Sequence, residues 1–175
     1  MSIVQEGDPV LREIAKPFSK EEFGSKELTS LIKKMTDLLD VEQNDYSVGV
    51  ALAAPQIGVS KRLFVVRYDR TNRKTRTAGS APDLGVFINP KIIRSSRKRV
   101  IMDEGCLSVR DLYGYVPRFE RATVEAYDES GKKFTRGAGG LLAQIFQHEI
   151  DHLDGILFID QATDCWRHGP PSDEQ

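Results

Sequence analysis

Between Ser25 and Leu39, apolar and polar residues alternate with the period of a helix. The apolar positions follow an i, i+3, i+4, i+7 spacing, and lysines and Asp37 occupy the other side. The apolar residues are Leu28, Leu31, Ile32, Met35, Leu38 and Leu39. Serine is a residue type that caps the first turn of a helix. We therefore predict an amphipathic helix that starts after Ser25 and ends near Asn44-Asp45.

A second helical pattern follows Gly139-Gly140, and its apolar residues surround much of the helix circumference. They are Leu141, Leu142, Ile145, Phe146, Ile150 and Leu153. Asp154-Gly155 supplies the stop expected after such a helix. Because few of its positions are polar, we expect this helix to be buried at the centre of the molecule.

Short apolar or alternating runs, which are typical of strands, occupy the chain between these helices. The predicted strands are residues 63–68, 86–93, 99–102, 115–119, 122–127 and 132–135. Asn89-Pro90 indicates an edge position or a bulge, because proline cannot donate to a sheet ladder. Asp128-Glu129-Ser130-Gly131 has the composition of a hairpin turn. We predict an antiparallel sheet.

The remaining segments have no clear period. Residues 49–58 are rich in Ala and Gly and contain a proline, so we interpret them as a loop. Residues 69–85 read as an exposed connection, and residues 156–159 as a short final strand. Asp8-Pro9 predicts a brief helical turn near the start of the chain.

Composition indicates an ordinary globular protein. The 175 residues are 39% apolar and 29% charged, with no apolar run long enough to cross a membrane. We predict one domain over residues 1–168 and a disordered tail at 169–175. The amino terminus lacks the features of a signal peptide, so we expect a cytoplasmic protein.

Charge gives no reason to predict a nucleic-acid partner. The net charge is −1, so any contact with a polyanion would have to be local. One basic cluster comprises Arg67, Arg70, Arg73, Lys74 and Arg76. We interpret it as a solvated loop rather than an RNA-docking patch, because few aromatic residues accompany it.

The strongest chemical signal is His148-Glu149-x-x-His152 within the second predicted helix. At about 100° per residue, the three side chains point into one sector of the helix, so both imidazoles can bind one metal. Glu149 is then close enough to take a proton from water without being a ligand. The alternative is two histidines satisfied in the core, but the chain has only three histidines and two are in this motif.

A catalytic metal site usually needs a third protein ligand. The extended peptidase motif is excluded because Phe158 stands where its last histidine would be. Glu174 lies in the predicted tail, and His168 beside Cys165 would need further ligands. Cys106 follows a predicted strand and a glycine that allows close approach, so we predict it as the third ligand.

Three stretches resemble the peptide deformylase family. They are Gly49-Val50-Ala51-Leu52-Ala53-Ala54-Pro55-Gln56, then Glu104-Gly105-Cys106-Leu107-Ser108, and finally residues 147–152. The resemblance extends over nearly the whole chain, including Asn89-Pro90 and Val116-Pro117-Arg118. One departure is Ala51, where the family usually has a second glycine, but no functional group is lost.

The resemblance implies an α+β fold with antiparallel sheets packed around the metal-bearing helix. It implies that Cys106, His148 and His152 bind one divalent metal, commonly Fe²⁺, with Zn²⁺, Ni²⁺ or Co²⁺ as alternatives. Glu149 would move protons, and the oxyanion would bind the backbone N–H of Leu107 and the side-chain amide of Gln56.

The reaction implied is hydrolysis of the N-terminal formyl group of formyl-methionyl peptides, with release of formate. The family's methionine pocket maps onto Val50, Met102, Leu141 and Ile145. We expect a monomer that acts on nascent chains at the ribosome, with neither membrane nor specific nucleic acid as a partner.

Two other functions remain open from sequence. A non-catalytic protein could use the metal for structure or recognise nascent amino termini without hydrolysis, and it would not need Glu149 or Gln56. A metallopeptidase could use the same motif with a longer cleft and a different third ligand. The three functions are distinguished by the products formed: formate from a deformylase, internally cleaved peptide from a metallopeptidase, and neither from a non-catalytic protein.

Overall fold

The computed structural model describes residues 2–41, 49–71 and 83–167. Its helices are α1 (Lys26–Val41), α2 (Tyr68–Thr71) and α3 (Gly140–Leu153), with 3-10 turns η1 (Pro9–Arg12), η2 (Lys20–Glu22), η3 (Ala54–Ile57) and η4 (Phe158–Asp160). Its strands are β1 (Ala51–Ala53), β2 (Leu63–Arg67), β3 (Leu84–Ser95), β4 (Arg99–Cys106), β5 (Val109–Phe119), β6 (Arg121–Tyr127), β7 (Lys133–Gly139) and β8 (Cys165–Arg167).

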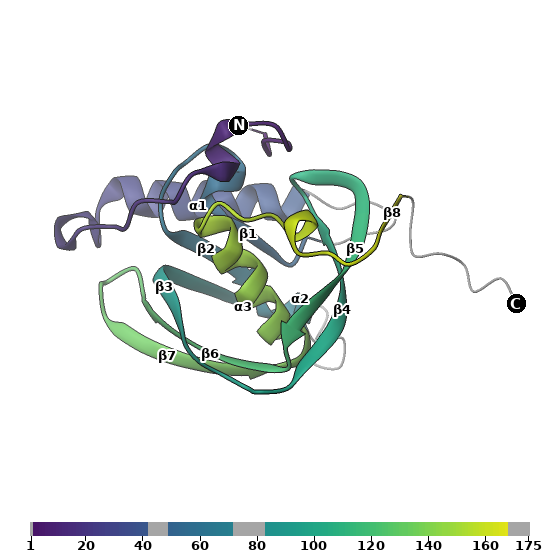
Figure 1. The fold of residues 1–175 in the computed structure, drawn as a ribbon. Helices are drawn as coiled ribbons and strands as arrows, with labels where there is room; N and C mark the ends of the chain where they lie inside the picture. Colours follow the sequence, from purple (N-terminus) through teal and green to yellow (C-terminus); the bar gives the residue numbers. More distant parts are fainter. Residues whose placement is uncertain (1, 42–48, 72–82, 168–175) are drawn as a thin grey trace, which may run out of the picture.

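The strands form two sheets, with α3 between them (Figure 1). One sheet has the order β1-β2-β3-β6-β7 and the other has the order β4-β5-β8. Every pair of neighbouring strands is antiparallel. The α+β fold and the antiparallel pairing predicted from the sequence are therefore confirmed.

Strand β2 is buried along its whole length because helices cover both faces of the sheet. Leu63 and Val65 belong to the apolar cluster that includes the buried side of α1. Phe64 and Val66 point the other way, into the cluster that includes α3. Successive residues of a strand face opposite sides, so an unbroken apolar run satisfies both helices.

Both predicted helices are present. Ser25 Oγ accepts a hydrogen bond from the backbone N–H of Leu28 and caps α1 as expected. The expected end of this helix near Asn44-Asp45 lies outside the described residues. Helix α3 ends where predicted, and Gly155 follows it with φ +75°, where an added Cβ would lie 2.6 Å from the carbonyl oxygen of Arg12. Only glycine allows the amino-terminal segment to pass so close.

Two of the irregular segments differ from the sequence prediction. Residues 51–57 are not a loop but the strand β1 followed by η3, because Ala51 to Ala53 pair with β2 in register despite their small side chains. Residues 156–159 are not a strand, because the Asp160 carboxylate accepts from the Leu157 N–H and closes η4. The last strand of the described chain is β8, which pairs with β5.

The connection after β2 also contains regular structure. Tyr68–Thr71 forms the short helix α2, and β3 already begins at Leu84, while residues 72–82 lie outside the described part. The predicted bulge is confirmed, since the register of β3 with β6 shifts between Ile88 and Lys91. The side chain of Asn89 bonds both the N–H and the carbonyl of Phe18 there. Strand β3 is internal, so Asn89-Pro90 marks a bulge rather than an edge.

Arg67 and Arg70 are not part of a solvated loop. Both guanidinium groups pair with Asp40 at the end of α1, and Arg67 also pairs with Asp69. Arg67 is only 7% exposed. Its two carboxylate partners compensate for the cost of burying the guanidinium charge. Arg73, Lys74 and Arg76 lie outside the described residues, as does the predicted tail.

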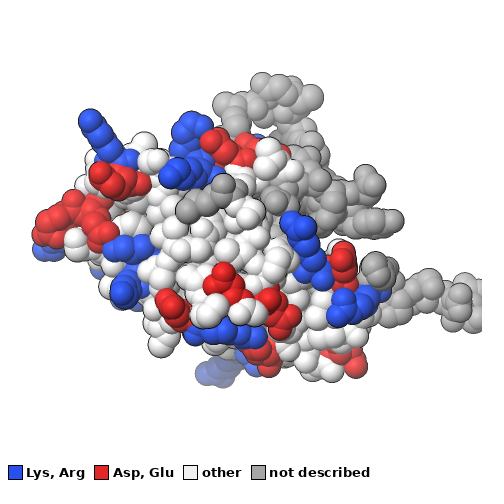
Figure 2. Space-filling view, turned by 90° about the horizontal axis from the view of Figure 1, so that it is seen from above, with Lys and Arg blue, Asp and Glu red and all other residues white. Residues whose placement is uncertain are grey.

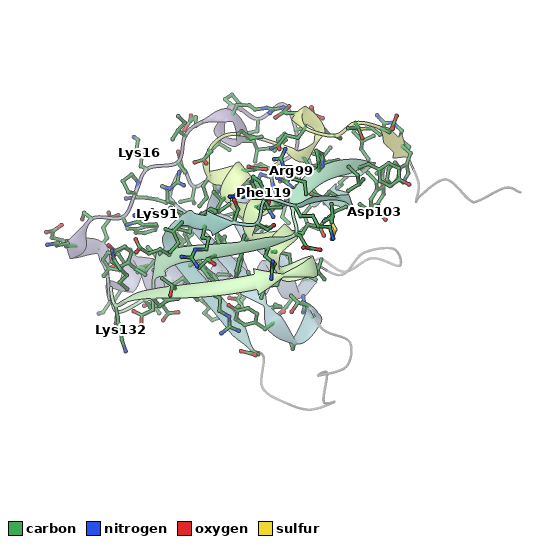
Figure 3. All side chains as sticks on the ribbon, turned by 60° about the horizontal axis from the view of Figure 1, so that its bottom comes forward. Lys16, Lys91, Arg99, Asp103, Phe119 and Lys132 are labelled. Atoms are coloured by element: carbon green, nitrogen blue, oxygen red, sulfur yellow. The ribbon has the colours of Figure 1, made fainter. Side chains whose placement is uncertain are left out.

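The described surface mixes charges of both signs. On the face seen from above, Lys and Arg side chains alternate with Asp and Glu around a largely uncharged middle (Figure 2). On β4, the Arg99 guanidinium lies 4.6 Å from the ring centre of Phe119, while Asp103 lies further along the same strand (Figure 3). Within the described ranges, no helix has the length and apolar character needed to cross a bilayer.

Candidate active site

Cys106, His148 and His152 converge between the end of β4 and helix α3. Their ligand atoms lie within 4.8 Å of one another, and Cys106 Sγ is 3.2 Å from His152 Nε2. Metal bonds of about 2.0–2.3 Å place neighbouring ligand atoms roughly 3.5 Å apart in a tetrahedral site. A thiolate and two imidazoles at this spacing therefore fit one divalent transition metal.

A tight hairpin presents Cys106 to the helix. Strand β4 ends at Cys106 and β5 begins at Val109, so only Leu107 and Ser108 form the turn. Gly105 precedes the cysteine, where an added Cβ would lie 2.8 Å from the Tyr113 ring. The Ser108 N–H donates to Cys106 Sγ over 3.4 Å. Glycine and the turn together fix the direction of the sulfur.

The Gln56 amide is oriented by its own backbone neighbourhood. Its Oε1 accepts the N–H of Ala53 at 2.8 Å, which turns the amide nitrogen toward the hairpin. Nε2 then donates to Cys106 Sγ at 3.4 Å and to Ser108 Oγ at 3.3 Å. Gln56 is buried and borders the same cavity as Cys106, so its N–H group is a fixed donor beside the three ligands.

Behind His148 lies a buried carboxylate held by an arginine. Glu104 Oε2 is 2.9 Å from His148 Nδ1, and Arg118 binds both oxygens of Glu104 at 2.7 and 2.8 Å. Arg118 also bonds Asp151 at 2.5 Å. Burial opposes ionisation of Glu104, but the bonds from Arg118 and His148 outweigh it and lower its pKa to about 2. An ionised Glu104 accepts from Nδ1 and leaves Nε2 of His148 for a metal.

Glu149 differs from Glu104 because no cation is bonded to it. Its Oε2 is buried without a hydrogen-bond partner among the described residues, and burial raises its pKa to about 7. His152 Nδ1 is likewise buried and unpartnered in the described chain, and burial followed by repulsion from His148 lowers the pKa of His152. A neutral imidazole is the form that binds a metal.

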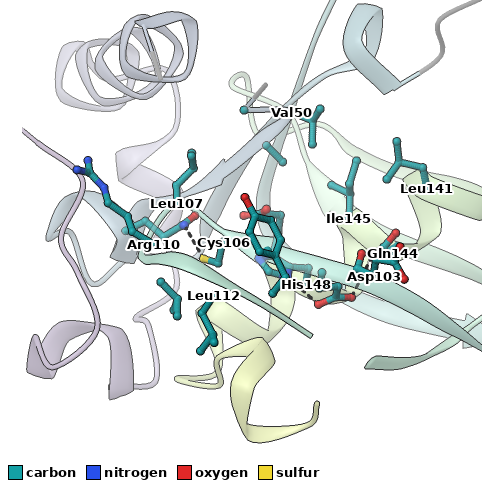
Figure 4. Close-up of a pocket in the computed structure, with 18 of the residues that line it drawn as sticks. Val50, Asp103, Cys106, Leu107, Arg110, Leu112, Leu141, Gln144, Ile145 and His148 are labelled. Atoms are coloured by element: carbon teal, nitrogen blue, oxygen red, sulfur yellow. Dashed lines mark hydrogen bonds and ion pairs between the residues drawn. The ribbon is translucent and has the colours of Figure 1, made fainter. Parts of the chain in front are cut away.

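A cavity of about 540 Å³ opens beside these groups. Val50, Leu141 and Ile145 line it on one side of His148, and Leu107 and Leu112 lie on the opposite side (Figure 4). The predicted pocket residue Met102 does not line this cavity. Further lining residues that the sequence reasoning did not single out are Asp103, Val109, Arg110, Asp111, Leu112, Tyr113 and Gln144. Residues 109–113 directly follow the cysteine motif, and this proximity is the feature of the sequence that could have indicated them.

The sequence model of the polypeptide deformylases matches residues 1–168. The chain belongs to the polypeptide deformylase family. A peptide deformylase of Halothermothrix orenii is 45% identical over 159 residues, which cover 90% of each chain. That of Carboxydothermus hydrogenoformans is 42% identical over 167 residues, covering 95% of this chain and 96% of the relative.

Solved deformylase structures have the same fold. The class I type b peptide deformylase from Acinetobacter baumannii, bound to Met-Ala-Ser, matches with a TM-score of 0.79 and 35% identity, covering 92% of this chain and 97% of that one. Peptide deformylase 1B of Arabidopsis thaliana, in complex with an inhibitor, has the same score and identity, covering 94% and 82%. Members of this family are metal-dependent hydrolases, and the chain is an enzyme that removes the N-terminal formyl group from nascent peptides.

Proposed function

We propose that the three ligands hold Fe²⁺ and that the cavity binds the formyl-methionine end of a peptide. The observation that carries the proposal is the convergence of Cys106, His148 and His152 beside the buried Glu149, whose Oε2 has no hydrogen-bond partner in the described part of the chain. When bound, a divalent metal acts as a Lewis acid that lowers the pKa of water and polarises the formyl oxygen. Zn²⁺, Ni²⁺ and Co²⁺ suit the same ligands.

Glu149 is the proton carrier of the proposed reaction. It takes a proton from the attacking water and delivers it to the nitrogen of the departing amine, so the formyl C–N bond breaks and formate leaves. A carboxylate beside the attacking water can accept a proton and then return it to the leaving group. Glu149 is only 4% exposed, so bulk water has little access to the carboxylate that carries the proton.

Gln56 and the backbone N–H of Leu107 are the proposed donors to the developing oxyanion. Both groups border the cavity next to Cys106, and neither carries a charge. Gln56 Nε2 is already aimed at the cysteine because Oε1 is held by Ala53. Donors fixed before the reaction stabilise a transition-state charge without reorganising.

The apolar side of the cavity is the proposed methionine site. Val50, Leu141 and Ile145 supply a surface suited to an unbranched thioether. Met102, the fourth residue expected in this pocket, does not line the cavity, so the proposal rests on the other three. The Acinetobacter baumannii relative was solved with Met-Ala-Ser bound, which is the product expected from formyl-Met-Ala-Ser.

The setting of the reaction is proposed on the same basis. A formylated peptide is a product of initiation of protein synthesis, so we place the enzyme in the cytoplasm, acting as a monomer on nascent chains at the ribosome. We further propose that residues 1–168 form one domain, which is the range that the family model matches, and that residues 169–175 form a disordered tail.

The test is formate release from formyl-Met-Ala-Ser by protein purified without oxygen and assayed for bound metal. We expect formate in an amount equal to the free amine formed, and loss of turnover in Glu149→Gln with the metal retained. Internal cleavage of longer peptides would support the metallopeptidase instead. Tight binding of the peptide without formate would support the non-catalytic protein.

A further inference from the structure

Arg70 is not one of the proposed catalytic groups, but it is bonded to the wall of the cavity. Its Nη1 donates to the carbonyl oxygen of Gly49 at 2.7 Å. Gly49 is the first of three consecutive cavity-lining residues, followed by Val50 and Ala51. The guanidinium therefore binds the backbone of a segment that lines the cavity.

The same guanidinium is anchored at the end of helix α1. Nη1 also donates to the Leu39 carbonyl at 2.9 Å, and Nη2 bonds Asp40 at 2.7 Å. Carbonyls in the last turn of a helix lack intrahelical partners, and a cation there is favourable. Arg70 thus ties the cavity wall to the helix that covers the five-stranded sheet.

Arg67 completes this arrangement from β2. Its backbone N–H donates to the Val50 carbonyl at 2.8 Å, and its side chain pairs with Asp40 and with Asp69. The side chains of Arg67 and Arg70 are 9% and 11% exposed, so both cations are largely withdrawn from water. Two successive carbonyls of the wall, those of Gly49 and Val50, are consequently held by Arg70 and Arg67.

We propose that Arg70 is a positioning residue for substrate binding, which acts by holding Gly49 and Val50 against the peptide. This inference rests on the proposed function, because it assumes that the cavity binds the formyl-methionine end. The side-chain bonds of Arg70 in the described chain go to Leu39, Gly49 and Asp40, and none goes to the three metal ligands or to Glu149. Losing it should weaken substrate binding while leaving metal content and the chemical step nearly unchanged.

Arg62 offers a matched control. It also donates to two backbone carbonyls, those of Leu153 and Pro90, and pairs with one aspartate, Asp154, at the end of a helix. The difference is that neither carbonyl belongs to a residue that lines the cavity. Arg70→Met therefore removes bonds to the cavity wall, and Arg62→Met removes the same kinds of bond at a site away from the wall.

The experiment measures kcat, KM, metal content and hydrogen exchange for metal-loaded wild type, Arg70→Met, Arg70→Lys and Arg62→Met, with formyl-Met-Ala-Ser as substrate. In Arg70→Met we expect KM to rise about tenfold with kcat within about twofold, because charged hydrogen bonds to the wall are lost. Exchange at the Val50 and Ala51 amides should quicken in the same variant. Arg70→Lys keeps the charge and one donor nitrogen, so its KM should lie between those of wild type and Arg70→Met. Arg62→Met should leave KM unchanged.

The proposal is overturned if Arg70→Met has the KM of wild type, or if Arg62→Met raises KM as much. If Arg70→Met does not fold, Asp40→Asn decides the question, since it weakens the anchor but keeps both arginines. A KM rise of about threefold in Asp40→Asn supports the proposal, and an unchanged KM rejects it. Wild type that releases no formate would instead reject the proposed function, while the exchange measurement would still test the wall.

Discussion

Two clusters built around arginine lie on either side of the cavity, and they use charge differently. Behind His148, the side chains of Arg118 and Glu104 are 4% and 2% exposed, and the Glu104 carboxylate is hydrogen-bonded to the His148 imidazole. Behind Gly49, Arg67 and Arg70 both form ion pairs with Asp40, whose side chain is 40% exposed. Arg70 also donates hydrogen bonds to backbone carbonyls. The first cluster orients a side chain, and the second restrains a segment of main chain.

The difference follows from what each side of the site must hold. A metal ligand needs one ring orientation and one tautomer, which a buried carboxylate fixes through a single bond. A binding wall needs its backbone held in place, for which several donors anchored by a partly exposed carboxylate are enough. Burying an ion pair seldom adds net stability, so the deep cluster is explained better by its contact with His148 than by its contribution to folding.

The largest expected effect compares Arg118→Met with Arg67→Met. Removing Arg118 leaves Glu104 buried without its cation, and the free energy of unfolding should fall by about 3–5 kcal/mol. Removing Arg67 leaves Asp40 and Asp69, which are 40% and 24% exposed and can be solvated. The loss there should be about 1–2 kcal/mol. Urea unfolding of both metal-free variants measures the two losses, and equal values would abolish the distinction between the clusters.

Within the active site, Glu149 provides a second contrast with Glu104. Burial raises the pKa of Glu149 from 4.5 to about 7 in the absence of metal, so the folded protein holds this proton more tightly than the unfolded chain does. The resulting stabilisation is complete below pH 4.5 and is lost as the pH rises through 7. The loss is about 3 kcal/mol, at about 1.36 kcal/mol for each pKa unit.

Comparing the metal-free wild type with Glu149→Gln isolates this effect from that of the histidines. The neutral glutamine should give a flatter dependence of unfolding free energy on pH between 4.5 and 7. Two curves of the same shape would show that Glu149 ionises as easily in the folded protein as in the unfolded chain.

A smaller effect is expected for Glu104→Gln. The amide oxygen can still accept from His148 Nδ1, but the charge that strengthens this bond is lost, and metal affinity should fall about 10–100-fold. Asp40→Asn removes one charge from the other cluster and should leave metal affinity as in wild type. Competition with a chelator for Zn²⁺ or Co²⁺ measures both constants. A similar loss in Asp40→Asn would mean that affinity reports general loosening of the fold.

Local patterns in the sequence predicted the elements that depend on neighbouring residues. The periods of α1 and α3 and the spacing of His148 and His152 are set within one helix, and the structure has both helices and brings the two histidines together. The preceding glycine and the family resemblance together indicate Cys106 as the third ligand. The roles of these residues in catalysis remain predictions.

What the sequence did not predict depends on contacts between distant segments. Glu104 and Arg118 were visible in two motifs, but their pairing depends on the register of β4 with β5. Arg67 and Arg70 appeared to belong to a solvated loop because Asp40, their partner, is 27 and 30 residues away. Strand β1 was missed because its pairing with β2, rather than its small side chains, makes it a strand.

The smallest expected effect tests whether the apolar side of the cavity recognises methionine. Ile145 and Ile150 lie on α3, are 5% and 7% exposed, and belong to the same apolar cluster, but only Ile145 lines the cavity. Replacing either by valine removes one methylene group and should cost similar stability. In Ile145→Val alone, kcat/KM for formyl-Met-Ala-Ser should fall about fourfold relative to the formyl-Gly analogue, which corresponds to about 0.8 kcal/mol for one buried methylene. If both variants changed the two substrates equally, Ile145 would act only in the core, and the side chain of methionine would have to bind elsewhere in the cavity.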